Sequence, residues 1–298
     1  MVAVVPTSAS AAPTGVVAQR KSRTGYLLLF PGMAWLAIFF AIPFITLFMT
    51  SLQEPVPGKA GRYQPAFNLG NYAEAFTEYW DVYIRSFVYA GIATALALAI
   101  AYPLAYFIAF RAGRWRSLML VLVIAPSFAS VLLRTYAWKT ILADEGIITS
   151  TLNALHLLPD DRILNTGIAV VAGLTYNFLP FMILPLYAAL EKIDPRLIEA
   201  ASDLYASPQT AFRKVTWPLS MPGVVAGTLL TFIPAAGDYI NAELLGSTGN
   251  RMIGNAIQTN FIEFRDYPIA SALSFMLMAI ILVLVFTYIR RAGTEDLV

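Results

Sequence analysis

Six stretches of this 298-residue chain contain no charged residue and are long enough, or nearly so, to cross a lipid bilayer as helices. A membrane span needs roughly 20 apolar residues, with about 17 as the lower limit. The sequence therefore predicts an all-α integral membrane protein with about six transmembrane helices. The stretches are residues 24–53, 86–110, 117–133, 163–190, 215–237 and 267–289.

Composition agrees with this prediction, because only 13% of the residues are charged and the mean hydropathy is +0.66. Soluble domains usually carry about twice that charged fraction. The third stretch is the shortest, with 17 residues between Arg116 and Arg134. We expect its helix to continue through Thr135 to Trp138, with the Arg134 side chain directed into protein or water rather than lipid.

The distribution of Lys and Arg predicts the orientation. If the N-terminus is inside, 12 of the 20 basic residues fall in inner segments and 8 in outer segments, and the short inner loop 111–116 carries three Arg. The positive-inside rule then places both termini in the cytoplasm. Residues 1–24 are predicted to be a flexible cytoplasmic tail rather than a cleaved signal, because their small residues precede the charges. Residues 25–298 form the predicted transmembrane domain.

Several functions are disfavoured by what the sequence lacks. There is no Cys and only one His, His156, which we expect in a solvated loop, so neither thiol chemistry nor a His metal cluster is expected. A net charge of +2 gives no reason to expect a nucleic-acid partner. No G-x-x-x-x-G-K-[ST] loop is present to hold ATP phosphates. We predict no catalytic residue, no metal and no cofactor in this chain.

The inner loop 191–218 contains two helix-start signals. Asp194-Pro195 and Ser207-Pro208 each combine a capping side chain with a proline suited to the first helical position. They predict a helix–turn–helix knob on the cytoplasmic face. By spacing alone, an interfacial amphipathic helix and a partner-docking element are equally consistent with this pattern.

The residues of the knob favour docking. Glu199-Ala200-Ala201, followed by Val215-Thr216-Trp217-Pro218, resembles the E-A-A-x3-G-x9-I-x-L-P loop of binding-protein-dependent ABC importer permeases. The resemblance implies a type I importer permease whose knob docks in a groove of a separate ATPase subunit, which binds ATP and Mg. It assigns this coupling role to Glu199, Ala200, Ala201, Asp203 and Leu204.

The resemblance departs from the family at Tyr205, where the family has Gly. Glycine adopts a positive φ without cost, whereas Tyr would cost on the order of 1–2 kcal/mol. This turn is therefore where a difference from the family is expected.

Other segments look like the spermidine/putrescine (polyamine) importer permeases. They are 133–138, 244–246, 252–255 and 265–268. The resemblance covers roughly residues 26–291. It implies a multi-pass protein of the bacterial cytoplasmic (inner) membrane. Its implied partners are ATP-binding subunits, a second permease subunit and an extracytoplasmic substrate-binding protein.

A polyamine pathway should offer carboxylates and aromatic faces. Asp238 directly follows a charge-free stretch, where Pro234 and Gly237 favour a helix break. An equally consistent role for Asp238 is an ion pair with Arg251 or Arg265. The other candidate pathway residues are Tyr239, Glu243, Tyr136, Trp138 and Tyr176, although Glu243 could be simply exposed and the last three could anchor the membrane interface instead.

Two alternatives remain open from the sequence. The first is an importer permease of the same architecture for another small solute. If that solute is an anion, the acidic residues after the fifth stretch argue against it. The second is a secondary transporter driven by an ion gradient, which would not need the Glu199 knob. An intramembrane enzyme is disfavoured, because no Ser/Lys or Asp/Asp pair is clustered in the spans.

Overall fold

The computed structural model describes residues 23–58, 61–155 and 162–292, with side chains from residue 29 to residue 290 within those ranges. His156 and residues 1–22 of the predicted tail lie outside the described residues. The chain divides by its contacts into two compact units, residues 1–46 and 47–298. The first unit holds α1 (Arg23–Leu36), a short π-helix η1 (Ala37–Ala41) and the first half of α2 (Ile42–Ser51).

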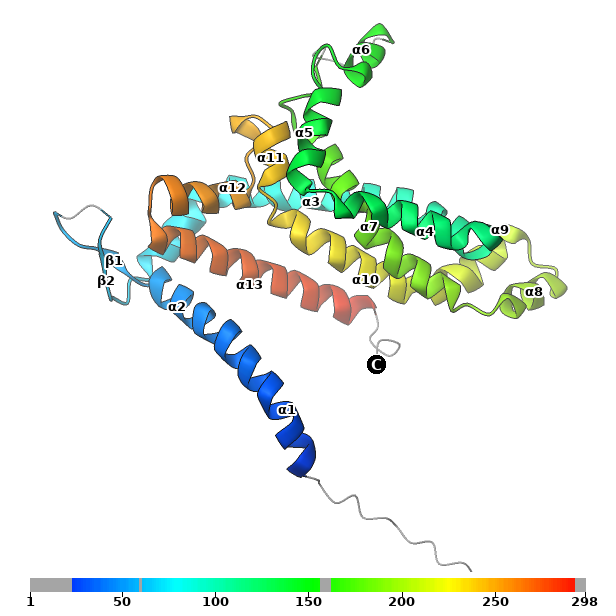
Figure 1. Ribbon diagram of the computed structural model, residues 1–298, viewed down its shortest axis with the longest axis horizontal. Helices are drawn as coiled ribbons and strands as arrows, with labels where there is room; N and C mark the ends of the chain where they lie inside the picture. Colours follow the sequence, from blue (N-terminus) through cyan, green and yellow to red (C-terminus); the bar gives the residue numbers. More distant parts are fainter. Residues whose placement is uncertain (1–22, 59–60, 156–161, 293–298) are drawn as a thin grey trace, which may run out of the picture. The chain divides into compact units, whose positions relative to one another are not determined.

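The second unit holds nearly all of the remaining secondary structure and every candidate site residue (Figure 1). Its elements, in chain order after α2, are β1 (Glu54–Pro55), β2 (Tyr63–Gln64), α3 (Gly70–Phe110), η2 (Gly113–Trp115), α4 (Arg116–Ile124), η3 (Ala125–Phe128), α5 (Val131–Ile141), α6 (Ile147–Ala154), α7 (Gly167–Glu191), α8 (Pro195–Asp203), α9 (Pro208–Ala211), η4 (Phe212–Thr216), α10 (Trp217–Ala236), α11 (Ile240–Leu245), η5 (Thr248–Asn250), α12 (Ile253–Gln258), η6 (Thr259–Glu263) and α13 (Tyr267–Ala292).

The predicted spans are present as helices. Within the described residues, five helical segments are long and apolar enough to cross a membrane, and a bent pair brings the number to six. The second span is much longer than predicted, because α3 begins at Gly70 rather than near Ser86. The five segments are Leu29–Ser51, Gly70–Phe110, Gly167–Glu191, Pro208–Ala236 and Tyr267–Arg290.

The third span is the bent pair, and our prediction of a continuous helix through Trp138 is wrong. Segments Gly113–Phe128 and Val131–Ile141 meet at 93°. Pro126 precedes the bend, and the backbone of Ala129 and Ser130 is extended, with ψ values of 149° and 134°. A proline disturbs the turn that precedes it, and here the chain tightens into the 3-10 turn η3 before the extended residues 129 and 130.

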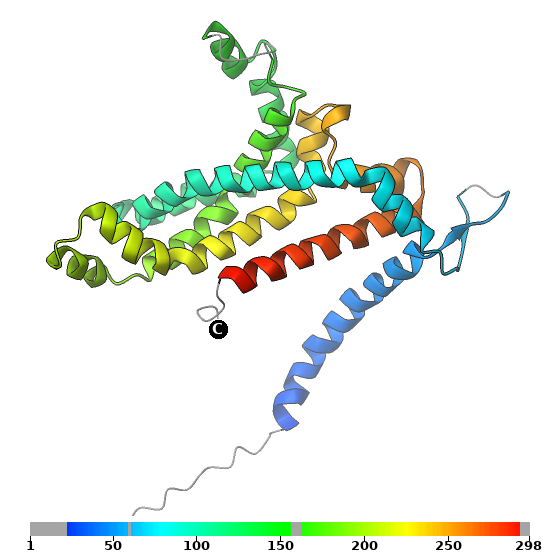
Figure 2. The same ribbon diagram turned by 180° about the vertical axis from the view of Figure 1, so that it is seen from behind.

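Three helices form the centre of the second unit. α3, α7 and α10 pack side by side, with α13 against α3 and α10; Figure 2 shows α3 in cyan along the length of this bundle. Fully buried alanines recur every fourth residue on α3, at Ala97, Ala101 and Ala105. Small residues at this spacing let helix backbones approach closely in membranes, where lipid offers no hydrophobic driving force between helices.

Two connections mark opposite ends of the second unit. Figure 1 shows α8 and α9 at one end, and β1 and β2 at the opposite end. The two strands pair antiparallel, Glu54 opposite Gln64 and Pro55 opposite Tyr63. The Tyr63 hydroxyl donates to the Arg265 carbonyl at 3.0 Å, which links this hairpin to the segment before α13. The predicted inner loop 191–218 and the hairpin of the first outer segment therefore lie at opposite ends, and α6, in the second outer segment, projects away from the bundle between them (Figure 1).

Candidate functional site

The knob is built from two capped helices, as the sequence predicts. The Asp194 side chain accepts the backbone N–H of Arg196 at 2.9 Å, with Pro195 as the first residue of α8. Ser207 accepts the N–H of Thr210 at 3.3 Å in the same way at the start of α9. Each cap satisfies one N–H group that a helix start leaves free. The predicted helix–turn–helix is confirmed.

The turn between these helices keeps the conformation that favours glycine, although Tyr205 occupies it. Tyr205 has φ = 58°, its N–H donates to the Ser202 carbonyl, and the N–H of Ala206 donates to the Ala201 carbonyl. These two bonds are the Schellman pattern that ends many helices. Holding a tyrosine in this left-handed region costs roughly 1–2 kcal/mol. The turn therefore keeps the positive φ that glycine would favour, and the expected change of conformation is not seen. The cost is a strained backbone at Tyr205.

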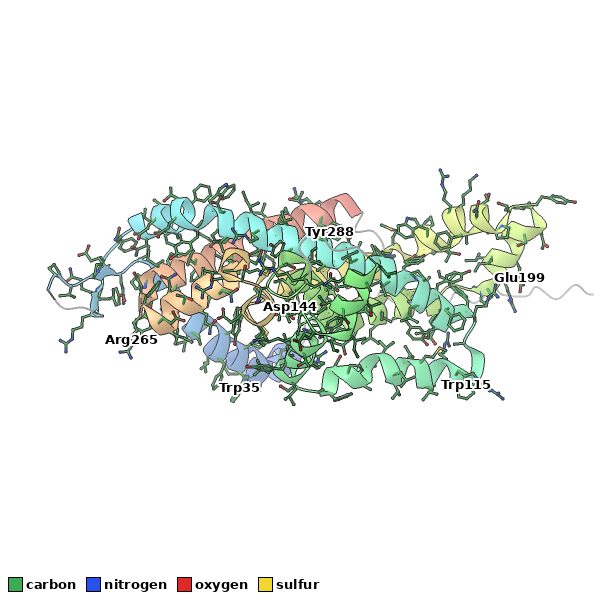
Figure 3. All side chains as sticks on the ribbon, turned by 90° about the horizontal axis from the view of Figure 1, so that it is seen from above. Trp35, Trp115, Asp144, Glu199, Arg265 and Tyr288 are labelled. Carbon is green, nitrogen blue, oxygen red and sulfur yellow. The ribbon has the colours of Figure 1, made fainter. Side chains whose placement is uncertain are left out.

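The coupling residues lie on the surface of the knob. Glu199, Ala200 and Asp203 are exposed, Ala201 is half-buried, and Leu204 is 82% exposed. Figure 3 shows Glu199 at the same end as Trp115 and far from Arg265. Within the part of the chain that the structure describes, Glu199 forms no ion pair. A partner could therefore reach this carboxylate directly.

The span ends next to the knob are tied to one another on its α7 side. Arg116, the first residue of α4, donates to the Glu191 carboxylate at 2.8 Å and to the Ala109 carbonyl at 3.1 Å. Its guanidinium also lies 5.3 Å from the centre of the Tyr187 ring. The ends of α3 and α7 and the start of α4 are thereby tied together. The sequence placed Arg116 in the inner loop but did not indicate this contact.

Aromatic rings join the knob to the bundle on its α10 side. The Tyr102 ring centre lies 5.7 Å from that of Phe212 and 5.1 Å from that of Trp217. The buried Tyr102 hydroxyl is 2.8 Å from the Ser220 hydroxyl. Phe212, which follows α9, and Trp217 at the start of α10 therefore both pack against α3.

The second candidate site lies at the far end of α10. The predicted helix break is confirmed, because α10 ends at Ala236 and α11 starts at Ile240. In the link between them, Asp238 accepts the backbone N–H of Asn241 at 2.8 Å. Burial raises the pKa of the Asp238 carboxyl above its ordinary value, and the hydrogen bond from the Asn241 backbone N–H opposes that shift.

The link is held closely from the other side by Gly254. A Cβ on this glycine would lie 2.5 Å from the Gly237 carbonyl oxygen and 3.0 Å from that of Asp238. Among the described residues Asp238 forms no ion pair with Arg251 or Arg265, so the pairing that the sequence left open is not observed. The Asp238 carboxylate therefore serves here as a helix cap beside a helix break.

Asn255 connects the other acidic candidate to this link. Its buried amide nitrogen donates to the Tyr239 carbonyl and to the Glu243 carboxylate, each at 3.0 Å. Glu243 is exposed and borders a hollow of about 270 Å³ shared with Arg251. Tyr239 is 43% exposed. Glu243 is thus exposed and also fixed in position.

A buried polar junction lies where α5, α7 and α11 meet. The Asn177 amide donates to the Asn241 Oδ1 at 2.8 Å and lies 3.5 Å from the Thr135 hydroxyl. The Asn177 Oδ1 and Asn241 Nδ2 are buried without a hydrogen-bond partner, as are the Nε and Nη1 of Arg134. Buried polar groups are normally paired, and exceptions often mark function or bound water. The sequence did not single out Asn177 or Asn241, and only the position of Asn241 beside Asp238 could have indicated it.

The aromatic candidates separate into two groups. Trp138 and Tyr176 pack edge to face, with ring centres 5.3 Å apart, on the helices α5 and α7 that carry the junction. Tyr136 is 53% exposed. The described residues contain no group of three His, Asp or Glu that could hold a metal ion.

Comparison with known protein families decides between the classes of protein that the sequence left open. The family model described as "Binding-protein-dependent transport system inner membrane component" matches residues 11–292. The chain belongs to this family. It is therefore a multi-pass inner-membrane component of a transport system and not an enzyme.

Individual relatives cover most of the chain. The spermidine/putrescine transport system permease PotB of Haemophilus influenzae is 39% identical over 86% of this chain and 90% of that protein. PotB of Escherichia coli is 36% identical over 87% and 94%. The Escherichia coli inner membrane ABC transporter permease YdcU is 30% identical over 78% of each chain.

Solved structures support the fold. A chain of a bacterial alginate ABC transporter, in complex with an alginate-bound periplasmic protein, superposes with a TM-score of 0.71. The match covers 92% of this chain and 95% of the other at 17% identity. A second alginate importer structure gives a TM-score of 0.67. At this identity the likeness shows the type I importer permease fold and nothing about the solute.

Proposed function

We propose that this chain is the permease subunit of an ATP-driven importer that moves polyamines across the inner membrane by alternating access. The observation that carries the ATP-driven mechanism is the exposed knob at Glu199, which connects α7 to α10 and packs through Phe212 on Tyr102 of α3. This chain has no phosphate-binding loop of its own, so ATP and Mg are assigned to separate ATP-binding subunits. A second permease subunit and an extracytoplasmic binding protein complete the proposed assembly.

The proposed solute rests on the names of the relatives and on the chemistry of the residues around Asp238. Relatives with 36–39% identity are named spermidine/putrescine permeases. Ammonium groups bind carboxylates, carbonyl oxygens and aromatic faces. These groups are supplied by Asp238, Tyr239, Glu243 and the Trp138–Tyr176 pair. Tyr136 is assigned to the mouth of the pathway. The break between α10 and α11 leaves backbone carbonyls near Asp238 available to a cation.

One observation favours a different solute. The Nε and Nη1 of Arg134 are buried without a hydrogen-bond partner, and Arg134 forms no ion pair within the described residues. An unpaired guanidinium repels a polycation and attracts an anion. The second candidate is therefore an ATP-driven importer permease of the same architecture for a small solute carrying an anionic group.

Uptake measurements separate these candidates. Cells lacking this chain are given labelled spermidine or putrescine, with and without the gene restored. We expect restored uptake that stops when ATP is depleted and persists when the proton gradient is collapsed. Uptake that follows the proton gradient would contradict the ATP-driven mechanism, and polyamine uptake independent of the chain would contradict the solute.

Two substitutions test the assigned residues. Glu199→Lys reverses the charge of the knob, so transport should be lost while membrane insertion persists; normal uptake would refute the coupling role. Asp238→Asn should reduce polyamine uptake much more than it reduces assembly with the ATP-binding subunits. Asp144→Asn is the matched control, because it neutralises an exposed carboxylate of the outer segment 134–162 that is not assigned to the pathway. Equal loss of uptake and assembly in Asp238→Asn would make Asp238 a structural residue.

A further inference from the structure

The tip of the knob contains two local conflicts that nothing in the described part of the chain relieves. Tyr205 is held at φ = 58°, yet its side chain is 98% exposed and packs on nothing that would compensate for the strain. Glu199 and Asp203 are four residues apart on α8, so two like charges share one helix face. Both carboxylates are exposed and neither forms an ion pair within the described residues.

The same tip presents an apolar stripe. Leu197 and Ala200 on α8 and Leu204, the residue at its C-terminal cap, lie at spacings of three and four, and the Tyr205 ring extends this stripe beyond the helix end. Leu197 is 48% exposed and Leu204 is 82% exposed, and α8 buries no residue at all. The surface is therefore an apolar stripe ending in an aromatic ring and edged by two carboxylates.

We propose that Tyr205 is an anchor that inserts into an apolar pocket of the ATP-binding subunit, with basic residues of that subunit at the rim facing Glu199 and Asp203. This inference rests on the proposed function and adds a specific contact to it. Backbone strain persists where the surroundings compensate for it, and here the compensation comes from the partner. Buried aromatic residues dominate binding energy at interfaces.

The anchor also determines which ATP-binding subunit fits. A groove without such a pocket cannot accept the tyrosine ring. Tyr205 therefore selects an ATP-binding subunit with a matching pocket and excludes one without it. Specificity of this kind combines a favourable contact with the right partner and a clash with the wrong one.

Binding to the complete membrane assembly tests the anchor. The full-length chain and its second permease subunit are placed in lipid nanodiscs, and the Kd of the purified ATP-binding subunit is measured. Glycine and asparagine both adopt a positive φ readily, so Tyr205→Gly and Tyr205→Asn remove the ring without straining the turn. We expect each to weaken binding about ten- to thirtyfold. Tyr205→Phe keeps the ring and should stay within about threefold of the original.

Thermal unfolding and one further variant make the result decisive. The Gly and Asn variants should unfold at temperatures no lower than the original chain. Original affinity in both variants would overturn the anchor, and so would a lower unfolding temperature in both, because the ring would then stabilise its own chain. Glu199→Lys is measured beside them. If only Glu199→Lys weakens binding, the anchor fails and the coupling role stands; if it also binds normally, the proposed docking of the knob fails.

Discussion

The crossing of α7 and α10 depends on two glycines, and replacing them gives a graded prediction. Gly223 and Gly227 are four residues apart on α10. A Cβ at 223 would lie 2.5 Å from the Ala189 Cβ and 2.7 Å from the Pro185 carbonyl oxygen. Carbon atoms in contact are normally about 3.5–4 Å apart, so α7 must move by roughly 1 Å.

The magnitude follows from which atoms obstruct the new methyl group. At 223 the obstructing atoms are a short side chain and backbone, which cannot rotate away, so Gly223→Ala should lower the free energy of unfolding by about 2–3 kcal/mol. At 227 the nearest atom is the Met182 sulfur at 2.8 Å, in a flexible side chain, and the nearest backbone atom is the Met182 carbonyl oxygen at 3.1 Å, farther than the 2.7 Å at 223. Gly227→Ala should therefore cost only about 1 kcal/mol.

Gly91→Ala is the matched control, because Gly91 lies within α3 with no atom within 4 Å of an added Cβ. It should leave stability unchanged or raise it by up to about 1 kcal/mol, since alanine is the better helix former. The assay is unfolding of the purified full-length chain in mixed detergent micelles, followed by circular dichroism. A Gly223→Ala variant as stable as Gly91→Ala would refute the close crossing.

Three further substitutions test other contacts. Arg116→Ala removes a partly exposed ion pair with Glu191, so the free energy of unfolding should change by less than about 1 kcal/mol. ATP hydrolysis stimulated by the binding protein should fall in this variant. Full stimulation would exclude a role of Arg116 in coupling. Gly254→Ala places a methyl group 2.5 Å from the Gly237 carbonyl oxygen. Polyamine uptake should therefore fall, and the free energy of unfolding should decrease by about 1–3 kcal/mol. Normal uptake would show that the link between α10 and α11 tolerates movement. Asn255→Leu removes the amide that donates to the Tyr239 carbonyl and the Glu243 carboxylate. The loss of these bonds should lower the free energy of unfolding by about 1–3 kcal/mol in the same assay. No change would mean that water replaces the amide.

Local signals in the sequence predicted the local structure correctly. Asp194-Pro195 and Ser207-Pro208 start helices, and α10 ends at Ala236 beside the predicted break. These features depend on a few neighbouring residues, so short sequence patterns contain the information. The first span and the last three also appear near the predicted positions, because an apolar stretch of sufficient length has few other stable structures in a bilayer.

The features that the sequence did not predict depend on contacts between distant residues. Asn177 and Asn241 are 64 positions apart, and Tyr102 and Ser220 are 118 apart. An apolar stretch predicts that a helix spans the membrane but not which neighbour it packs against. The 93° bend before α5 was missed for a related reason. Pro126 indicated a weak point, but the charge-free stretch around it also fits a straight helix.

The two candidate sites are the two ends of one helix. α10 begins at Trp217, against the knob, and ends at Ala236, two residues before Asp238. Its close crossing with α7 at Gly223 and Gly227 lies between these ends. With a rise of 1.5 Å per residue, Ala236 is about 16 Å and Trp217 about 12 Å from the centre of the crossing. A tilt of α10 by about 10° around that point would move Ala236 by about 3 Å and Trp217 by about 2 Å in the opposite direction. A displacement of about 2 Å at the knob would therefore be enough to separate Asp238 from α11, which it caps, or from Gly254. Docking at one end of α10 is thereby linked to the geometry of the pathway at the other end.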